Sequence, residues 1–254
     1  MIDPEALNQY RTNGWVTVEN VFEGWEVDRI AEIALQVSRS EETSGEEVRS
    51  YRTDISAEGD TAPRKIEGPF FKHQAFQSFV LDERLESMLK SILGAKPLLK
   101  GDQIFMKPPH FGSAKPYHQD NFYFDCHPGD HVITAWIALD DVDEANGCLR
   151  YVSGSHREGV LPHEPLPGQP YDLTPTEDRV DLNRETTAPV KKGGVVFHHS
   201  EALHTSHRNT SDRWRRAYAT HWVTADVTTT TDALERAYFN LPEFHEIVTR
   251  EASK

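Results

Sequence analysis

The pattern of apolar and polar positions changes near residue 98. Before that point, apolar residues recur with helical spacing over 25–37 and over 81–92, and each stripe predicts a helix that packs on a core. Asp3 predicts the start of a further helix, because aspartate is a preferred N-cap, and Gly14 predicts its end. The first part of the chain is therefore predicted to be mainly helical.

Short segments of strand composition dominate from residue 98 onward, after one early strand in the helical part. These segments are rich in β-branched and aromatic residues, and proline and glycine turns separate them. They lie at 15–22, 98–106, 132–139, 148–152, 194–198 and 215–223. Many short strands without interleaved helices predict a mainly β fold with flanking helices, built on a barrel or double-sheet jelly roll.

We interpret residues 1–254 as a single domain, a length at which all-β barrels commonly stand alone. Its parts are a helical N-terminal region at about 1–97, a jelly-roll core at about 98–225 and a C-terminal tail at 226–254. Two long polar stretches, 40–63 and the proline-rich 157–192, do not fit a compact core. Loops of this length are either functional lids or disordered, and the sequence leaves both readings open.

Charge and cysteine content narrow the class of protein. The net charge of -14, from 27 basic and 41 acidic residues, argues against nucleic-acid binding, which needs a basic face. It does not exclude an anionic small substrate, because a local pocket can be basic on an acidic protein. Cys126 and Cys148 form no zinc spacing and no disulfide framework.

The N-terminal segment is polar, and no run of about 18 apolar residues suggests a membrane span. A cytoplasmic monomer or small homo-oligomer that acts on a small molecule is the expectation.

His118 and Asp120 form an H-x-D pair. Residues i and i+2 of a strand point to the same side, so both side chains can reach one ion. Imidazole plus carboxylate suits Fe(II), and a third ligand from a distant strand completes a two-histidine, one-carboxylate triad. The predicted strand at 193–198 and the residues after it supply several candidates for this third ligand. They are His198, His199, His204 and His207.

Several motifs together resemble the phytanoyl-CoA dioxygenase-like family of 2-oxoglutarate oxygenases. The motifs are KPP at 107–109, HQD at 118–120, AWIAL at 135–139, NGCL at 146–149, SGSH at 153–156, GGVVFHHSEALHTSHRN at 193–209 and WRRA at 214–217. The resemblance implies a double-stranded β-helix (jelly-roll, cupin-like) core. It also implies Fe(II), 2-oxoglutarate as co-substrate and O2, and it selects His204 as the third metal ligand.

The same resemblance assigns residues to the co-substrate. Arg215 stands where the family's arginine holds the distal carboxylate of 2-oxoglutarate, and a guanidinium matches a carboxylate with two parallel hydrogen bonds. On a strand that begins at Arg215, the small residues Ala217 and Ala219 share its face and leave room. Arg213 and Arg216 remain alternatives. The further pocket residues implied are Ser206, Gln119, Trp136, Gln103 and Lys65.

The expected reaction is hydroxylation of an unactivated C–H bond of a small metabolite, coupled to decarboxylation of 2-oxoglutarate to succinate. Alternatives are an acyl-CoA 2-hydroxylase of the phytanoyl-CoA type, a cupin-like metal enzyme that does not use 2-oxoglutarate, and a non-catalytic binding protein. Residues 121–124, directly after the metal pair, are expected either to wall an apolar substrate or to pack in the core.

Overall fold

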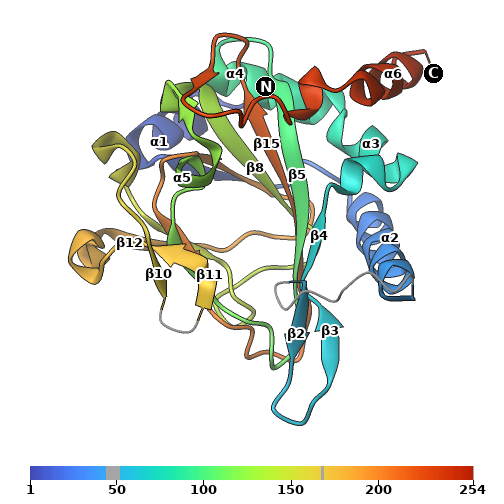
Figure 1. Cartoon of the computed structure of the whole chain (residues 1–254), viewed down its shortest axis with the longest axis vertical. Helices are drawn as coiled ribbons and strands as arrows, with labels where there is room; N and C mark the ends of the chain where they lie inside the picture. The colour runs from blue at the N-terminus through green and yellow to red at the C-terminus, as the bar shows by residue number, and fades with distance from the viewer. Residues whose placement is uncertain (44–51, 167–168, 254) are drawn as a thin grey trace.

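Two antiparallel sheets facing each other form the core of the molecule. The computed structural model describes residues 1–43, 52–166 and 169–253. The larger sheet has the order β1-β13-β8-β15-β5-β4 and the smaller sheet the order β12-β9-β14-β6. In Figure 1, β5, β8 and β15 lie on one side of the barrel and β12 on the other. This arrangement is the predicted double-stranded β-helix.

The strand bounds follow the predicted segments closely in the core. The larger sheet contains β1 (Trp15–Val18), β4 (Lys65–Glu67), β5 (Leu98–Lys107), β8 (Val132–Ala138), β13 (Val195–His199) and β15 (Arg215–Val223). The smaller sheet contains β6 (Lys115–His118), β9 (Leu149–Val152), β12 (Glu185–Ala188) and β14 (His204–Ser206). Three further pairs are β2 (Thr53–Ile55) with β3 (Thr61–Pro63), β7 (Cys126–His127) with β16 (Thr228–Thr229), and β10 (Glu164–Leu166) with β11 (Gln169–Thr174).

The period-two alternation of each strand gives the larger sheet two different faces. Outward side chains such as Ile104, Ile133 and Tyr218 belong to an apolar cluster that also contains helical residues. Inward side chains such as Trp136 and Ala219 belong to a second cluster inside the barrel. Because both faces are covered, β8 is buried along its whole length. The inner face is the one that carries the functional side chains.

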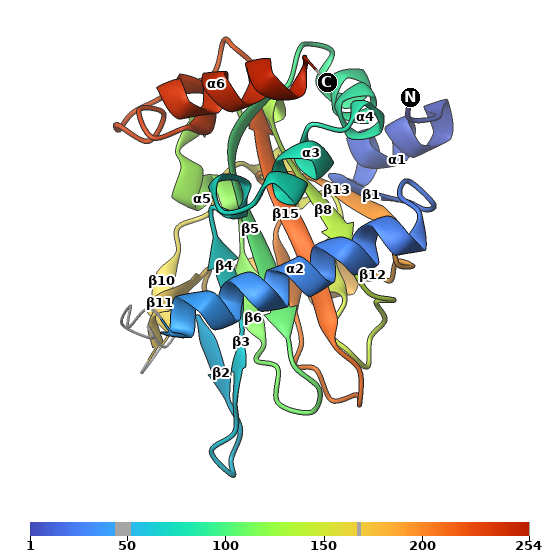
Figure 2. The ribbon, with the colours of Figure 1, turned by 90° about the vertical axis from the view of Figure 1, so that its right-hand side faces the viewer.

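Helices cover the outer face of the larger sheet, with α2 running across it in Figure 2. The α-helices of the described residues, of which α5 lies at the inner side of the barrel, are α1 (Pro4–Asn13), α2 (Gly24–Thr43), α3 (Gln74–Val80), α4 (Glu83–Leu93), α5 (Asp120–Phe124) and α6 (Pro242–Glu251). The short 3₁₀ turns are Pro69–Phe71, Gly129–His131, Ser155–Glu158, Glu177–Arg179, Leu182–Arg184 and Tyr238–Asn240. Asp3 caps α1 by accepting the Ala6 N–H at 2.8 Å, and Gly14 ends it with a left-handed φ of 81°, as predicted. None of the described helices is long and apolar enough to span a membrane.

Three short strands between residues 53 and 67 correct the expectation of a single early strand in the helical region. Strands of three residues carry too little periodicity to detect, and β4 is held by its pairing with β5. Within 40–63, residues 44–51 lie outside the described residues.

The second long stretch, 157–192, contains β10, β11 and β12, so its described part is folded. The predicted tail at 226–254 contains helix α6. The ring of Phe244 in this helix packs on the ring of Phe70, with 5.2 Å between the centroids.

Candidate metal centre

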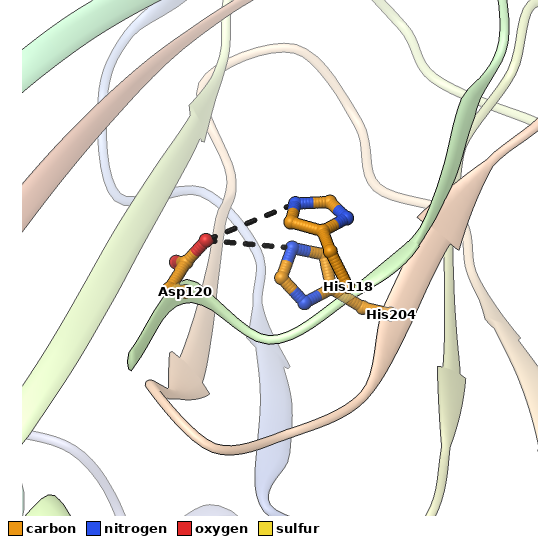
Figure 3. Close-up of side chains that lie close together, drawn as sticks. All are labelled: His118, Asp120 and His204. Carbon is orange, nitrogen blue, oxygen red and sulfur yellow. Dashed lines mark ion pairs between the residues drawn. The ribbon is translucent and has the colours of Figure 1, made fainter. Parts of the chain in front are cut away.

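The side chains of His118, Asp120 and His204 meet at one end of the barrel. His118 is the last residue of β6, and the register of the sheet places it directly opposite His204, the first residue of β14. Asp120 begins α5. The Nε2 atoms of both histidines lie 3.8 Å from Oδ1 of Asp120 (Figure 3). Within the described residues, these form a group whose ligand atoms all lie within 4.8 Å of one another, as three ligands of one ion require.

The outer nitrogen of each imidazole is already bonded to the backbone. Nδ1 of His118 donates to the Pro116 carbonyl at 2.8 Å, and Nδ1 of His204 donates to the Ala202 carbonyl at 2.9 Å. These bonds fix the tautomer that leaves Nε2 with a lone pair for a metal. Burial lowers the pKa of His118 well below its usual range and lowers the pKa of His204 to about 4. Both rings are therefore neutral, the form that binds metal.

The carboxylate of Asp120 is oriented in the same way. Its Oδ2 accepts hydrogen bonds from the Thr134 hydroxyl at 2.7 Å and from Nε2 of His198 at 3.1 Å. Burial alone raises the pKa of Asp120, but the hydrogen bond from His198 and the neighbouring His204 hold it well below its usual range. Oδ1 faces the two imidazoles. The donor set of two neutral imidazoles and one ionised carboxylate fits Fe(II).

The other candidate histidines lie elsewhere. His198 supports Asp120, and its Nδ1 accepts a hydrogen bond from the Tyr151 hydroxyl at 2.8 Å. His199 contacts Asp130 at 3.0 Å, and His207 is exposed. Sequence reasoning missed the supporting roles of His198 and Thr134. The two-residue alternation of their strands turns both side chains inward, toward His118 and Asp120. This alternation could have predicted their supporting roles from the sequence.

Arg215 lies inside the barrel and is 3% exposed. Its Nη2 donates to the Ser206 hydroxyl at 3.4 Å, its Nε donates to the Gly147 carbonyl at 3.2 Å, and its guanidinium lies 5.4 Å from the Trp136 ring centroid. Burial lowers the pKa of Arg215 to about 10. The structure thus brings Arg215, Ser206 and Trp136 together.

The small residues Ala217 and Ala219 belong to the cluster inside the barrel, on the same face as Arg215. The alternatives to Arg215 are engaged elsewhere: the exposed Arg213 pairs with Asp143 at 2.6 Å, and the half-buried Arg216 pairs with Asp140 at 2.6 Å.

The remaining predicted pocket residues divide into two groups. Gln103 lies opposite Ala219 in the sheet, and Lys65 lies opposite Phe105 and pairs with Glu67 at 3.0 Å. Both therefore lie on inward positions of their strands.

Gln119 does not join the Arg215 cluster. As the residue between His118 and Asp120 it points the other way, and its amide bonds to the Gly159 and Glu201 carbonyls and the Leu161 N–H.

Lys107 is a buried residue near Arg215 that sequence reasoning passed over. Its ammonium donates to the carbonyls of Ser113 at 2.7 Å and His207 at 2.6 Å. Burial, and then the charge of Arg215, lower the pKa of Lys107 well below its usual range. These bonds hold the chain that follows β14, and with it Ser206, against the end of β5.

The segment after the metal pair packs partly on the β10–β11 hairpin. Phe122 stacks on His163 with 4.2 Å between ring centroids, and the Tyr123 hydroxyl donates to the Leu173 carbonyl at 3.4 Å. Tyr123 is 43% exposed and its ring lies 6.3 Å from that of His118. The segment is therefore not entirely buried in the core. The partly exposed Tyr123 ring lies beside the metal ligand His118.

A jelly-roll barrel that holds two histidines and one carboxylate at one end is the arrangement of the non-haem Fe(II) oxygenases. Comparison with known proteins identifies the family. Residues 10–217 match the family described as phytanoyl-CoA dioxygenase (PhyH), so the chain belongs to this family.

Individual relatives agree with this assignment. A phytanoyl-CoA dioxygenase domain-containing protein 1 homolog from Caenorhabditis elegans is 25% identical, over 85% of this chain and 89% of its own length. A probable alpha-ketoglutarate-dependent hypophosphite dioxygenase from Stutzerimonas stutzeri is 28% identical, over 87% of this chain and 79% of its own.

Among solved structures, the alpha-ketoglutarate-dependent carbocyclase SnoK from nogalamycin biosynthesis is 27% identical with a TM-score of 0.71, over 91% of this chain and 88% of its own. Family, fold and site together make this chain an Fe(II)/2-oxoglutarate-dependent dioxygenase.

Proposed function

We propose that the enzyme hydroxylates an unactivated C–H bond of a small-molecule metabolite and converts 2-oxoglutarate to succinate. His118, Asp120 and His204 hold the iron in this proposal, and Arg215 with Ser206 holds the distal carboxylate of 2-oxoglutarate. The observation that carries it is the orientation of the three ligand atoms. Each imidazole has its other nitrogen bonded to the backbone, and Asp120 has its other oxygen bonded to Thr134 and His198.

The iron, when bound, supplies the activation of O2 and the oxidising power for the C–H bond. The residues of this chain bind and orient the reactants. Arg215 is a buried cation whose described hydrogen bonds go only to the neutral oxygens of Gly147 and Ser206, so a carboxylate here gains a charge-assisted partner. Ala217 and Ala219 leave room beside Arg215 inside the barrel. Trp136 lies opposite Ala219 on the neighbouring strand and belongs to the same cluster.

We further propose that the β10–β11 hairpin is the lid over the substrate. Three contacts support this role: Lys115 pairs with Asp172 at 2.7 Å, His163 stacks on Phe122, and Nε2 of His163 accepts the N–H of Gln119 at 3.1 Å. These contacts attach the hairpin to residues adjacent to the metal ligands. A closed hairpin excludes water from the reaction.

Succinate release from 2-oxoglutarate by anaerobically Fe(II)-loaded protein, with O2 added, tests the proposal. The assay is run over a library of metabolites and acyl-CoA thioesters, with hypophosphite included because one relative carries that name. Succinate that rises with a neutral or charged metabolite, together with a product 16 mass units heavier, is the expected result for hydroxylation. Stimulation by thioesters alone selects the acyl-CoA alternative. No succinate from iron-loaded protein contradicts the proposal.

A further inference from the structure

Lys100 is a cation that forms no ion pair with any residue that the structure describes. It is half-buried on β5, and among the described residues no carboxylate or carbonyl accepts a hydrogen bond from its ammonium group. Its nitrogen lies 4.3 Å from the centroid of the Phe124 ring. Burial lowers the pKa of Lys100, while nearby Cys126 and Asp120 raise it. A lysine in this setting gains from a carboxylate or another anionic oxygen group.

A β-bulge directs Lys100 toward the metal side of the sheet. In the pairing of β15 with β5, His221 lies opposite Gly101 and Trp222 lies opposite Leu99, so Lys100 is an extra residue. Extra residues of this kind re-aim a side chain and are frequent beside active sites. Without the bulge, the alternation of the strand places Lys100 on the outer face, because Gly101 is its inward neighbour.

A chain of contacts through Phe124 and His221 connects the side chain of Lys100 with the residues around the metal ligands. The Phe124 ring beneath it packs on the His221 ring with 4.8 Å between centroids. Nδ1 of His221 donates to the Thr134 hydroxyl at 2.9 Å, and that hydroxyl donates to Asp120. Arg215, the cation assigned to 2-oxoglutarate, begins β15, whereas Lys100 lies beside His221 near its other end. The two cations therefore lie toward opposite ends of β15.

We propose that Lys100 binds an anionic oxygen group of the oxidised substrate, a carboxylate or a phosphorus oxyanion, and places the rest of that molecule at the metal. This proposal rests on the proposed function for the identity of the centre. The net charge of the protein is -14, so its surface as a whole repels anions. Lys100 supplies a local positive charge that attracts an anion to this site. The Phe124 ring beside it suits the apolar part of such a substrate.

The test uses matched probes that differ only in charge. The carboxylates are hexanoate, phenylacetate and N-acetylphenylalanine, each compared with its primary amide, and hexylphosphonate is compared with its dimethyl ester. Stimulated succinate release is measured with wild-type Fe(II) protein and with Lys100→Met, Lys100→Arg and the control Lys96→Met. Lys96 is an exposed lysine four residues earlier, before the start of β5.

We expect the acids, and not the amides or the ester, to stimulate the wild type. Loss of one charge-assisted hydrogen bond raises the half-saturating acid concentration of Lys100→Met about 10- to 100-fold. Lys100→Arg restores part of this loss, and Lys96→Met behaves as wild type. If the carboxylates stimulate succinate release, the anionic group of the substrate is a carboxylate. If hexylphosphonate does so, the group is a phosphorus oxyanion. A purely structural role of Lys100 does not change the preference for acid over amide.

A binding measurement separates this proposal from the proposed function. The nickel-loaded protein with 2-oxoglutarate is melted in the presence of each probe, and no turnover is needed. We expect acids to raise the Tm of the wild type saturably and to leave Lys100→Met unchanged. Amides as effective as acids, a wild-type response in Lys100→Met, or no response of the wild type to acids in either assay overturns the role of Lys100. Absence of succinate with acid-dependent Tm shifts intact overturns only the proposed function.

Discussion

Replacement of Arg215 by methionine separates co-substrate binding from stability. Arg215 is buried, and burial lowers its pKa from the usual value of a guanidinium to about 10. One pKa unit corresponds to about 1.4 kcal/mol, so keeping this guanidinium charged at pH 7 costs the folded protein roughly 3 kcal/mol. The variant removes this cost. It also removes two hydrogen bonds and a cation–π contact with Trp136, worth about 1 kcal/mol each.

These opposing contributions nearly cancel. We expect the free energy of unfolding of metal-loaded Arg215→Met, without 2-oxoglutarate, to lie within about 1 kcal/mol of the wild-type value. Two charge-assisted hydrogen bonds to the distal carboxylate are lost, at about 1.5 to 3 kcal/mol each, so the 2-oxoglutarate concentration for half-saturation rises at least about 100-fold. Urea unfolding and titration of succinate release against 2-oxoglutarate measure the two quantities.

Arg213→Met is the matched control, because Arg213 is exposed, pairs with Asp143 and was an alternative to Arg215 in the sequence. It is expected to leave the 2-oxoglutarate requirement unchanged. An Arg215→Met protein with normal 2-oxoglutarate affinity, or one destabilised by several kcal/mol, contradicts a role of Arg215 in co-substrate binding and makes it a structural residue.

Three further predictions concern the buried polar residues Thr134, Ser206 and Asp102. Thr134→Val removes a donor to Asp120 and is expected to weaken metal binding about 10-fold in a competition with chelators, whereas unchanged affinity contradicts an orienting role. Ser206→Ala is expected to raise the 2-oxoglutarate requirement less than 10-fold, and a loss as large as that of Arg215→Met argues against the assignment. Burial raises the pKa of Asp102 from 3.8 to about 6, so its stabilising contribution is present below about pH 4 and is lost as the pH rises through 6. Asp102→Asn is therefore expected to gain up to about 3 kcal/mol relative to wild type between pH 4 and pH 7 in urea unfolding, and a pH-independent difference contradicts the shift.

The sequence pattern predicted the core strands and the pairing of His118 with Asp120, for a physical reason, whereas the family resemblance selected His204 from four candidate histidines. The strand β15 is long and buried at every position except Arg216, so its composition is distinctive, and the residues at i and i+2 of an H-x-D pair share a side. The face shared by Arg215, Ala217 and Ala219 followed from the same alternation and is confirmed.

Features that depend on non-local contacts were beyond sequence reasoning. Strands β2 to β4 are too short to carry a period, and they form because a partner strand lies beside them. The support of Asp120 by His198 joins residues 78 positions apart. The position of Lys100 depends on a bulge in the pairing of β5 with β15, which only the register reveals. Gln119 was assigned through resemblance, although the alternation of the strand turns it away from its neighbours.

Anaerobic titration of the Fe(II)-loaded protein with 2-oxoglutarate is the most direct test of whether His118, Asp120 and His204 form the iron site. The complex of Fe(II) with chelating 2-oxoglutarate absorbs visible light through metal-to-ligand charge transfer. The absorption band therefore shows that the iron and 2-oxoglutarate are bound together. We expect a saturable band in the wild type, no band in Asp120→Ala, and a band that needs far more 2-oxoglutarate in Arg215→Met. Iron that binds without producing the band, or an unchanged band in Asp120→Ala, contradicts the assignment of the metal centre.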